Sequence, residues 1–191
     1  MRMLIMGPPG AGKGTQAKLI GEHYEIPAIS TGDMFRAMKS ENSPLARQVR
    51  QIMESGGYVS DDVTNAIVAN RLAQGDCDHG FLLDGYPRTL QQVQYLDDHL
   101  EAGGKPLDGV VSLIADEDEL VERLLKRAEI EGRADDNDET IRKRLHIYAE
   151  QTEPLLDVYR SRGVLVEVNG LGSVGEVSQR IFDALDGHVR G

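Results

Sequence analysis

A glycine-rich turn near the start of the chain limits its possible folds more than any other stretch. The run GPPGAGKGT (7–15) follows an apolar segment, 1–6, and precedes a helical apolar pattern. Glycines allow backbone N–H groups to curl around an oxyanion, and the helix N-terminus that follows favours negative charge. The context predicts a phosphate-binding loop, with Lys13 as a cation for the outer phosphates. The alternative is a turn with a surface lysine, and four glycines around one lysine argue against it.

The loop departs from the usual phosphate-binding pattern at one position. That pattern is G-x-x-x-x-G-K followed directly by Ser or Thr, whose hydroxyl ligates magnesium. Here Gly14 follows Lys13, and the hydroxyl comes one position later, at Thr15. An ordinary GTPase or motor ATPase is therefore less consistent with this sequence.

Apolar segments typical of buried strands alternate with helical patterns along the chain. Strands are expected at 1–6, 26–29, 81–84, 109–114 and 164–168, and helices at 13–24, 34–38, 44–54 and 60–73 and after residues 116, 137 and 173. This alternation predicts an α/β fold with a parallel five-stranded sheet flanked by helices. Parallel sheets bind ligands at the carboxyl ends of their strands. The phosphate loop, 31–33, 84–88 and 169–170 all fall at those ends, which predicts a single site.

Asp84 directly follows an apolar strand, where proteins with a phosphate-binding loop keep a carboxylate for the metal. A helix cap or a turn aspartate is the alternative role. Because no hydroxyl directly follows Lys13, we expect Mg²⁺ to be held largely by nucleotide phosphates and by waters that Asp84 orients. No direct protein ligand to the metal is assigned.

Several arginines are clustered in the second half of an acidic chain. The net charge is −11, which argues against a broad nucleic-acid-binding face. Arg123 and Arg127 lie four residues apart on a predicted helix, Arg133 follows it, and Arg144 lies on the next helix. Guanidinium groups bind phosphates bidentately, so the group predicts a phosphate clamp. Asp116 and Glu119, at the start of the first of these helices, resemble a capping box.

Cysteine and histidine offer little for metal or redox chemistry. Cys77 is the only cysteine, and the five histidines show no ligand spacing. We therefore expect neither an internal disulfide nor a four-cysteine zinc site. No charged and apolar leader precedes the loop, and no apolar run approaches membrane-spanning length. These features predict a cytoplasmic protein with no membrane partner, and a monomer by default.

Four segments together resemble the adenylate kinase family, within the nucleoside monophosphate kinases. They are the loop 7–15, STGDMFR (30–36), GFLLDGYPRT (80–89) and ETIRKR (139–144). The resemblance covers essentially the whole chain and implies a P-loop NTPase-like fold. It also implies the reversible, Mg²⁺-dependent reaction ATP + AMP ⇌ 2 ADP, which maintains the balance of adenine nucleotides.

The resemblance implies a set of ATP-binding and catalytic residues. Those implied for ATP are Gly10, Ala11, Gly12, Lys13, Gly14, Thr15, Arg123, Arg127 and Gly172. Arg123 would lie against the ATP base, and Gly172 would offer its backbone to the adenine. The residues implied for catalysis are Lys13, Asp84, Arg88, Arg127, Arg133 and Arg144.

The resemblance also implies where AMP binds. Its contacts would be Thr31, Arg36, Gly57, Tyr58, Val59, Gly85, Tyr86, Pro87, Arg88, Gln92, Arg133 and Arg144. Gln92 would read adenine, because its amide offers both a donor and an acceptor. The Tyr86–Pro87 peptide corresponds to a family position that is often cis.

One domain over 1–191 is implied, with a core of 1–29, 60–127 and 138–191. An AMP-binding lobe would span 30–59 and a lid 128–137. Many family members have a longer lid, sometimes with four cysteines that bind zinc. This chain resembles the short-lid form, so no zinc is expected.

Three other functions fit parts of the pattern. The acceptor could be UMP or CMP, although Thr31 and Gln92 argue for AMP. The donor could be GTP, since stacking and backbone contacts discriminate poorly between bases. A regulatory module that binds nucleotides without turnover is the third alternative, and the presence of Lys13, Asp84 and the full set of arginines argues against it.

Overall fold

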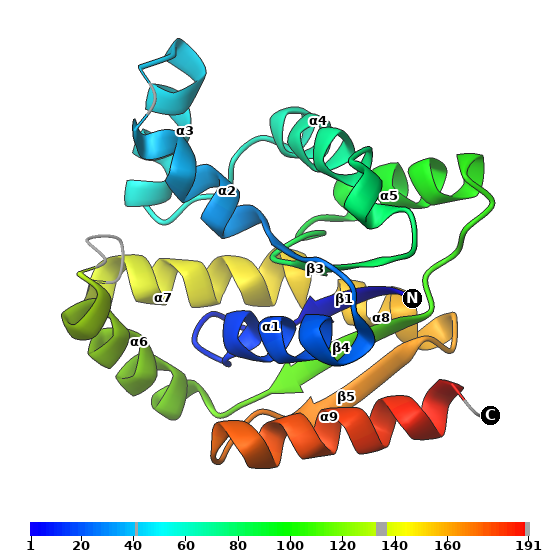
Figure 1. Cartoon of the computed structure of the whole chain (residues 1–191). Helices are drawn as coiled ribbons and strands as arrows, with labels where there is room; N and C mark the ends of the chain where they lie inside the picture. The colour runs from blue at the N-terminus through cyan, green and yellow to red at the C-terminus, as the bar shows by residue number, and fades with distance from the viewer. Residues whose placement is uncertain (41, 133–136, 190–191) are drawn as a thin grey trace.

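Strands and helices alternate along the chain as the sequence predicts (Figure 1). The computed structural model describes residues 1–40, 42–132 and 137–189. Its main elements are β1 (Arg2–Met6), α1 (Lys13–Tyr24), β2 (Ala28–Ser30), α2 (Thr31–Ala37), α3 (Pro44–Glu54), α4 (Asp61–Leu72), β3 (Phe81–Asp84), α5 (Leu90–Ala102), β4 (Gly109–Ile114), α6 (Glu117–Glu131), α7 (Asp138–Ile147), α8 (Leu155–Ser161), β5 (Leu165–Asn169) and α9 (Val174–Val189). Short 3₁₀ turns occur at Met38–Ser40 and Gly75–Cys77, and a π-helical turn at Tyr148–Thr152 links α7 to α8.

The described strands form one parallel sheet in the order β2-β3-β1-β4-β5. This confirms the predicted α/β class and the five-stranded parallel sheet. The predicted strand 26–29 is displaced, since β2 begins only at Ala28. The reason lies in the end of α1, where the Ile26 N–H donates to the Gly21 carbonyl (3.0 Å) and is not available to the sheet. The last strand is also displaced, by one residue, to Leu165–Asn169.

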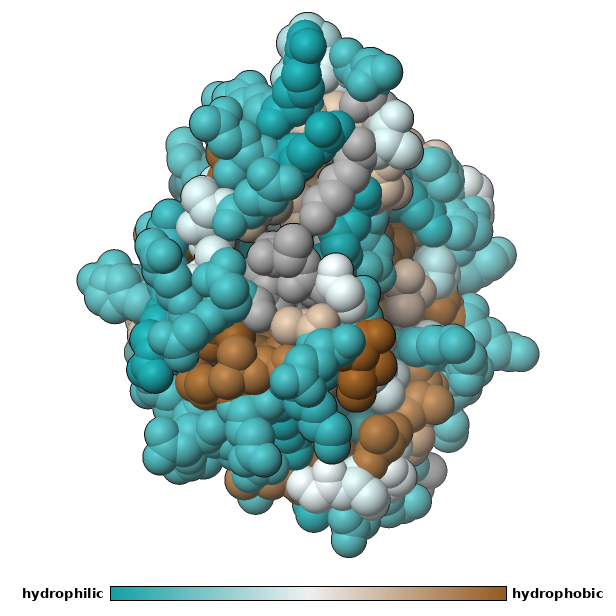
Figure 2. Space-filling view, turned by 90° about the vertical axis from the view of Figure 1, so that its left-hand side faces the viewer, coloured by the Kyte–Doolittle hydropathy of each residue, from teal (hydrophilic) through white to brown (hydrophobic). Residues whose placement is uncertain are grey.

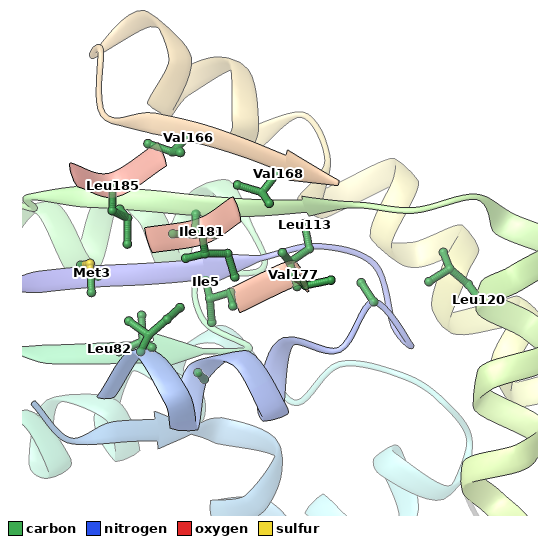
Figure 3. Close-up of a cluster of buried hydrophobic side chains, with 14 of the residues drawn as sticks. Met3, Ile5, Leu82, Leu113, Leu120, Val166, Val168, Val177, Ile181 and Leu185 are labelled. Carbon is green, nitrogen blue, oxygen red and sulfur yellow. The ribbon is translucent and has the colours of Figure 1, made fainter. Parts of the chain in front are cut away.

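The central strand β1 divides its side chains between the two faces of the sheet. Met3 and Ile5 belong to the cluster that packs against α1 and α9, which Figure 3 shows from within the core. Leu4 and Met6 belong to the cluster on the opposite face, which packs against α5 and α8. All four side chains are at most 3% exposed. Helices on both faces thus bury the sheet, and its carboxyl-end edge carries the phosphate loop.

Helices α2 and α3 stand away from the sheet (Figure 1) and have a small apolar cluster of their own. Its buried members are Phe35, Val49 and Val59. The prediction that 30–59 is a separate lobe is compatible with this cluster and stays a prediction. The predicted lid, 128–137, lies partly outside the described residues, and α6 continues through Glu131.

None of the helices in the described part of the chain is both long enough and apolar enough to cross a bilayer.

Ile181 on α9 provides a test of this core. It is 0% exposed and packs within the cluster on the α1 face. We expect Ile181→Ala to lower the free energy of unfolding by about 2–5 kcal/mol, because it removes buried methyl groups and leaves a cavity. The control is Val174→Ala on the same helix, where the side chain is 52% exposed and the change should stay within about 0.5 kcal/mol. Equal losses in urea denaturation would contradict the assignment of Ile181 to the core.

Candidate active site

The phosphate loop links β1 to α1 and depends on glycines with positive φ. Gly7, Gly10 and Gly12 have φ of 148°, 84° and 89°. A Cβ on Gly7 would lie 2.8 Å from the Leu113 carbonyl oxygen, so no side chain fits there. Gly12 occupies the N-cap of α1 without a side-chain hydrogen bond to the helix. The first N–H groups of α1 are therefore left to bind an anion.

Lys13 lies half-buried at the start of α1. Its Nζ donates to the carbonyl of Pro8 (2.9 Å), so the side chain folds back along the loop. Burial lowers the pKa of the Lys13 ammonium to about 8, and the positive charges of Arg88, Arg127 and Arg144 contribute to the lowering. Among the causes of this shift, only the negative charge of Asp84 raises the pKa of Lys13. The environment thus disfavours a bare ammonium, and a bound phosphate would relieve that cost.

Asp84 ends β3 beside the phosphate loop, because it pairs in register with Ile5 of β1. It is 8% exposed, and a Cβ built on Gly14 would lie 3.7 Å from its Oδ2. Burial raises the pKa of the Asp84 carboxyl, while the charges of Lys13 and Arg88 oppose that rise. The carboxylate oxygens therefore lie close to the place where the loop would hold phosphates.

The residues around Asp84 fit a magnesium ion that is held mainly by phosphates and water. Mg²⁺ prefers oxygen donors and retains several waters, and Asp84 supplies such oxygens beside the loop. No cluster of three or more His, Cys, Asp or Glu side chains suited to a metal occurs in the described part of the chain. A cage built from protein ligands alone is therefore absent from that part.

Two pockets open beside the loop and share a group of cations. The first is lined by ten of the residues predicted for AMP, which are Arg36, Gly57, Tyr58, Val59, Gly85, Tyr86, Pro87, Arg88, Gln92 and Arg144. The second is lined by seven of those predicted for ATP, which are Gly10, Gly12, Lys13, Gly14, Thr15, Arg123 and Arg127, and also by Asp84, which was predicted for catalysis. Lys13, Arg36, Arg88 and Arg144 line both. Figure 2 looks onto this edge of the molecule, where hydrophilic residues cover most of the surface.

Four predicted site residues do not line these pockets or cannot be placed. Thr31 is 1% exposed, and its hydroxyl donates to the Gly85 carbonyl (2.9 Å) from beneath the pocket. Ala11 is buried in the core, so only its backbone could contact a ligand. Gly172 is exposed in the turn before α9 with φ of 115°. Arg133 lies outside the described residues.

Arg88 is held by its neighbours on three sides. Its Nε donates to the Gly85 carbonyl (2.7 Å), and its guanidinium lies 5.0 Å from the centre of the Tyr58 ring. Its own carbonyl accepts a hydrogen bond from Thr152 Oγ1 (2.7 Å). Since that hydroxyl donates its one hydrogen to Arg88, the Tyr58 hydroxyl is the donor in its 2.9 Å contact with Thr152. These contacts hold the side chain in place at the junction of the two pockets.

Thr152 and Tyr148 are pocket residues that the sequence analysis missed. Both line the first pocket from the π-helical turn between α7 and α8. Such turns occur often at functional sites, but no pattern in the sequence marks one here. Threonine and tyrosine within a helical pattern are ordinary, so there was no signal to select them.

Arg123 and Arg36 have acidic partners in the structure. Arg123 donates to Glu119 (2.9 Å) and to the carbonyl of Gly170 (3.3 Å). The expected capping box at the start of α6 is therefore wrong: Asp116 caps the helix through the Asp118 N–H, and Glu119 pairs with Arg123 instead.

Arg36 pairs with Asp33, three residues earlier on α2. The Tyr86–Pro87 peptide is cis, as the family resemblance implies.

Comparison with known proteins decides the family. Residues 5–164 match the family described as adenylate kinase. The chain belongs to the adenylate kinase family. An adenylate kinase of Nocardioides sp. is 56% identical over 97% of both chains. One from Leifsonia xyli is 57% identical over 96% of this chain and 92% of its own, and one from Clavibacter michiganensis is 55% identical over 97% and 93%.

The lowered pKa of Lys13 predicts a pH dependence for this adenylate kinase family member. The value of kcat/KM for ATP should fall as the pH rises through about 8, because neutral Lys13 no longer attracts phosphates. This parameter reports ionisations of the free enzyme. The corresponding fall in kcat should occur at higher pH, since bound phosphates stabilise the ammonium.

The control is Lys13→Arg, which keeps its charge because arginine stays protonated throughout this pH range. Whatever activity this variant retains should lack the fall near pH 8. A wild-type kcat/KM for ATP that stays constant from about pH 7 to about pH 9.5 would contradict the assignment.

Proposed function

We propose that this chain transfers the γ-phosphoryl group of ATP to AMP and forms two molecules of ADP. One observation carries the proposal: two neighbouring pockets share Lys13, Arg36, Arg88 and Arg144. A cationic junction between two pockets suits two ligands that meet through their phosphates. Holding both reactants in this way replaces an encounter in solution by a step between bound groups.

ATP would occupy the pocket over the phosphate loop. The free N–H groups at the start of α1 and the Lys13 ammonium would bind its β- and γ-phosphates. Arg123, which donates to the Gly170 carbonyl, would lie against the base. Gly172 and Ala11 would contribute only their backbones.

AMP would occupy the other pocket, with its phosphate toward Arg88. Arg36 and Arg144 line the same pocket and would share the phosphate charge. Gly57, Tyr58 and Val59 would contact the nucleoside from one side, and 85–87 from the other. Gln92, which is 2% exposed and lines the pocket, would read the base. Thr31 would act mainly through Gly85, to which it is hydrogen-bonded.

The chemistry needs positioning and charge stabilisation rather than a general base. An oxygen of the AMP phosphate is already anionic and attacks the γ-phosphorus in line. The bond from that phosphorus to the bridging oxygen breaks, and ADP leaves. Lys13, Arg88, Arg127 and Arg144, together with Arg133, would stabilise the charge on the transferred group. Mg²⁺, when bound with ATP, would neutralise the donor phosphates beside Asp84.

We also propose the domain roles that the sequence suggests. The segment 30–59 would be the AMP-binding lobe, which the separate apolar cluster of Phe35, Val49 and Val59 supports. The segment 128–137 would be a short lid. Closure of both over the site would exclude water and suppress hydrolysis of ATP. We further propose that the enzyme acts as a cytoplasmic monomer.

Formation of ADP from MgATP tests the proposal when AMP, CMP, UMP and GMP are offered separately. Turnover with AMP alone, lost in Lys13→Ala, is the expected result. Preference for UMP or CMP would keep the phosphate chemistry and overturn the base assignment. Binding of ATP without turnover of any acceptor would favour a regulatory module. The same assay with GTP as the donor tests the choice of donor base.

Arg88 at the pocket junction gives a sharper prediction. We expect Arg88→Ala to lower kcat by about 10² or more, on the scale of losing one donor to a developing oxyanion. The matched control is Arg142→Ala, because Arg142 is exposed on α7 and pairs with Asp138 (3.1 Å). Steady-state kinetics with saturating AMP should show no change in that control. Full activity in Arg88→Ala would remove Arg88 from the mechanism.

A further inference from the structure

Asp61, the first residue of α4, contacts the proposed base reader although it is not among the predicted site residues. Its Oδ1 accepts a hydrogen bond from Gln92 Nε2 (2.8 Å) across 31 residues of sequence. The same oxygen accepts from Thr89 Oγ1 (2.9 Å). Thr89 in turn caps α5, since its hydroxyl accepts from the Gln92 N–H (3.3 Å). Asp61 therefore touches both the side chain of Gln92 and the residue that holds its backbone.

The partners of the Gln92 amide fix which way it faces. Its Oε1 accepts from the backbone N–H of Arg88 (2.7 Å), and that group can only donate. Its Nε2 donates to Asp61, whose ionised carboxylate can only accept. Turning the amide over would bring two donors together at Arg88 and two acceptors together at Asp61. Only one orientation of the amide satisfies both partners.

This orientation leaves Gln92 one N–H group and one oxygen lone pair for a ligand in the pocket that it lines. An amide free to turn over could pair with either of two purine edges. Adenine presents an acceptor at N1 and a donor at its 6-amino group. Hypoxanthine and guanine present the reverse, a donor at N1 and an acceptor at O6. A fixed amide matches one of these edges and opposes the other.

We propose that Asp61 is a positioning residue that determines base specificity. It holds the Gln92 amide in the orientation that pairs with adenine and rejects the 6-oxopurine edge. This inference rests on the proposed function, in which Gln92 reads the base of AMP. Asp61 acts through Gln92 and does not touch the reacting phosphates.

The test compares AMP with inosine monophosphate as acceptors. Inosine monophosphate has the N1–H and O6 of guanine but lacks its 2-amino group. It therefore tests the effect of the reversed hydrogen-bonding edge without a steric clash from that amino group. In Asp61→Ala, kcat/KM for AMP should fall about tenfold relative to that for inosine monophosphate, the effect of losing one well-placed hydrogen bond. Asp61→Asn keeps an acceptor oxygen and should retain selectivity within about threefold of the wild type.

The matched control is Asp62→Ala, because Asp62 is the exposed neighbouring carboxylate in the same first turn of α4. It shares any favourable effect of negative charge at the helix start, but within the described part of the chain it makes no hydrogen bond to the Gln92 side chain. Its selectivity should equal that of the wild type. If Asp61→Ala does not fold, Asp61→Ser replaces it, because serine suits a first helical turn and is too short to reach Gln92.

A third variant separates failure of this inference from failure of the proposed function. Gln92→Leu should lose activity with AMP if Gln92 reads the base. Unchanged kcat/KM in Gln92→Leu would overturn the role of Gln92 itself, and with it the role of Asp61. A second outcome would overturn only the role of Asp61. In it, Gln92→Leu loses activity with AMP, but Asp61→Ala either lowers kcat/KM equally for both acceptors or leaves it unchanged.

Discussion

The concentration of positive charge around Lys13 is the constraint on which the rest of the site depends. A chain with a net charge of −11 brings Lys13, Arg88, Arg127 and Arg144 close enough to influence one another. Burial and the neighbouring positive charges make the Lys13 ammonium costly in the absence of ligand, and Asp84 offsets only part of that cost. Phosphate groups are the partners that would neutralise them. The fold thus holds a cluster of positive charge that the phosphates of two bound nucleotides would neutralise.

The parallel sheet makes this arrangement possible. All the described strands run in the same direction, so the segments that leave β1, β2 and β3 meet at one edge. The loop after β1 provides Lys13, and the segment after β3 provides Arg88. Hydrogen bonds then restrain Arg88: its side-chain Nε donates to the Gly85 carbonyl, and its backbone carbonyl accepts from the Thr152 hydroxyl. Such restraint matters because positioned charges cost little reorganisation when the phosphoryl group moves.

Base recognition depends on the fixed orientation of a hydrogen-bonding side chain rather than on the concentration of charge. The cationic junction would attract any nucleotide phosphate, so it would not distinguish one base from another. Discrimination requires a hydrogen-bonding group whose polarity is fixed before the ligand arrives. The Gln92 amide is such a group, because its hydrogen bonds to Asp61 and to the Arg88 N–H fix its orientation. In the proposed function, charge and specificity would therefore come from separate contacts, although Arg88 would take part in both through different atoms.

Local patterns in the sequence predicted most of the fold. The glycines of the phosphate loop, the five apolar strands and the helix from Lys13 to Tyr24 all follow from neighbouring residues. The structure confirms them, although β2 and β5 begin later than predicted. Contacts between distant segments could not be predicted in this way. The bond from Thr152 to Arg88 joins residues 64 apart, and it depends on how α8 and the preceding π-helical turn dock on the sheet. The sequence pattern also could not decide the role of Glu119, because helix capping and pairing with Arg123 compete for the same carboxylate.

The stereochemistry of phosphoryl transfer tests the central claim most directly, namely that two bound nucleotides react with each other at the shared cationic junction. The measurement uses ATP whose γ-phosphorus is made chiral with oxygen isotopes and determines the configuration in the ADP formed from AMP. A single in-line displacement predicts inversion at phosphorus. Retention would require two displacements through a phosphorylated side chain, and that result would contradict the direct transfer described here.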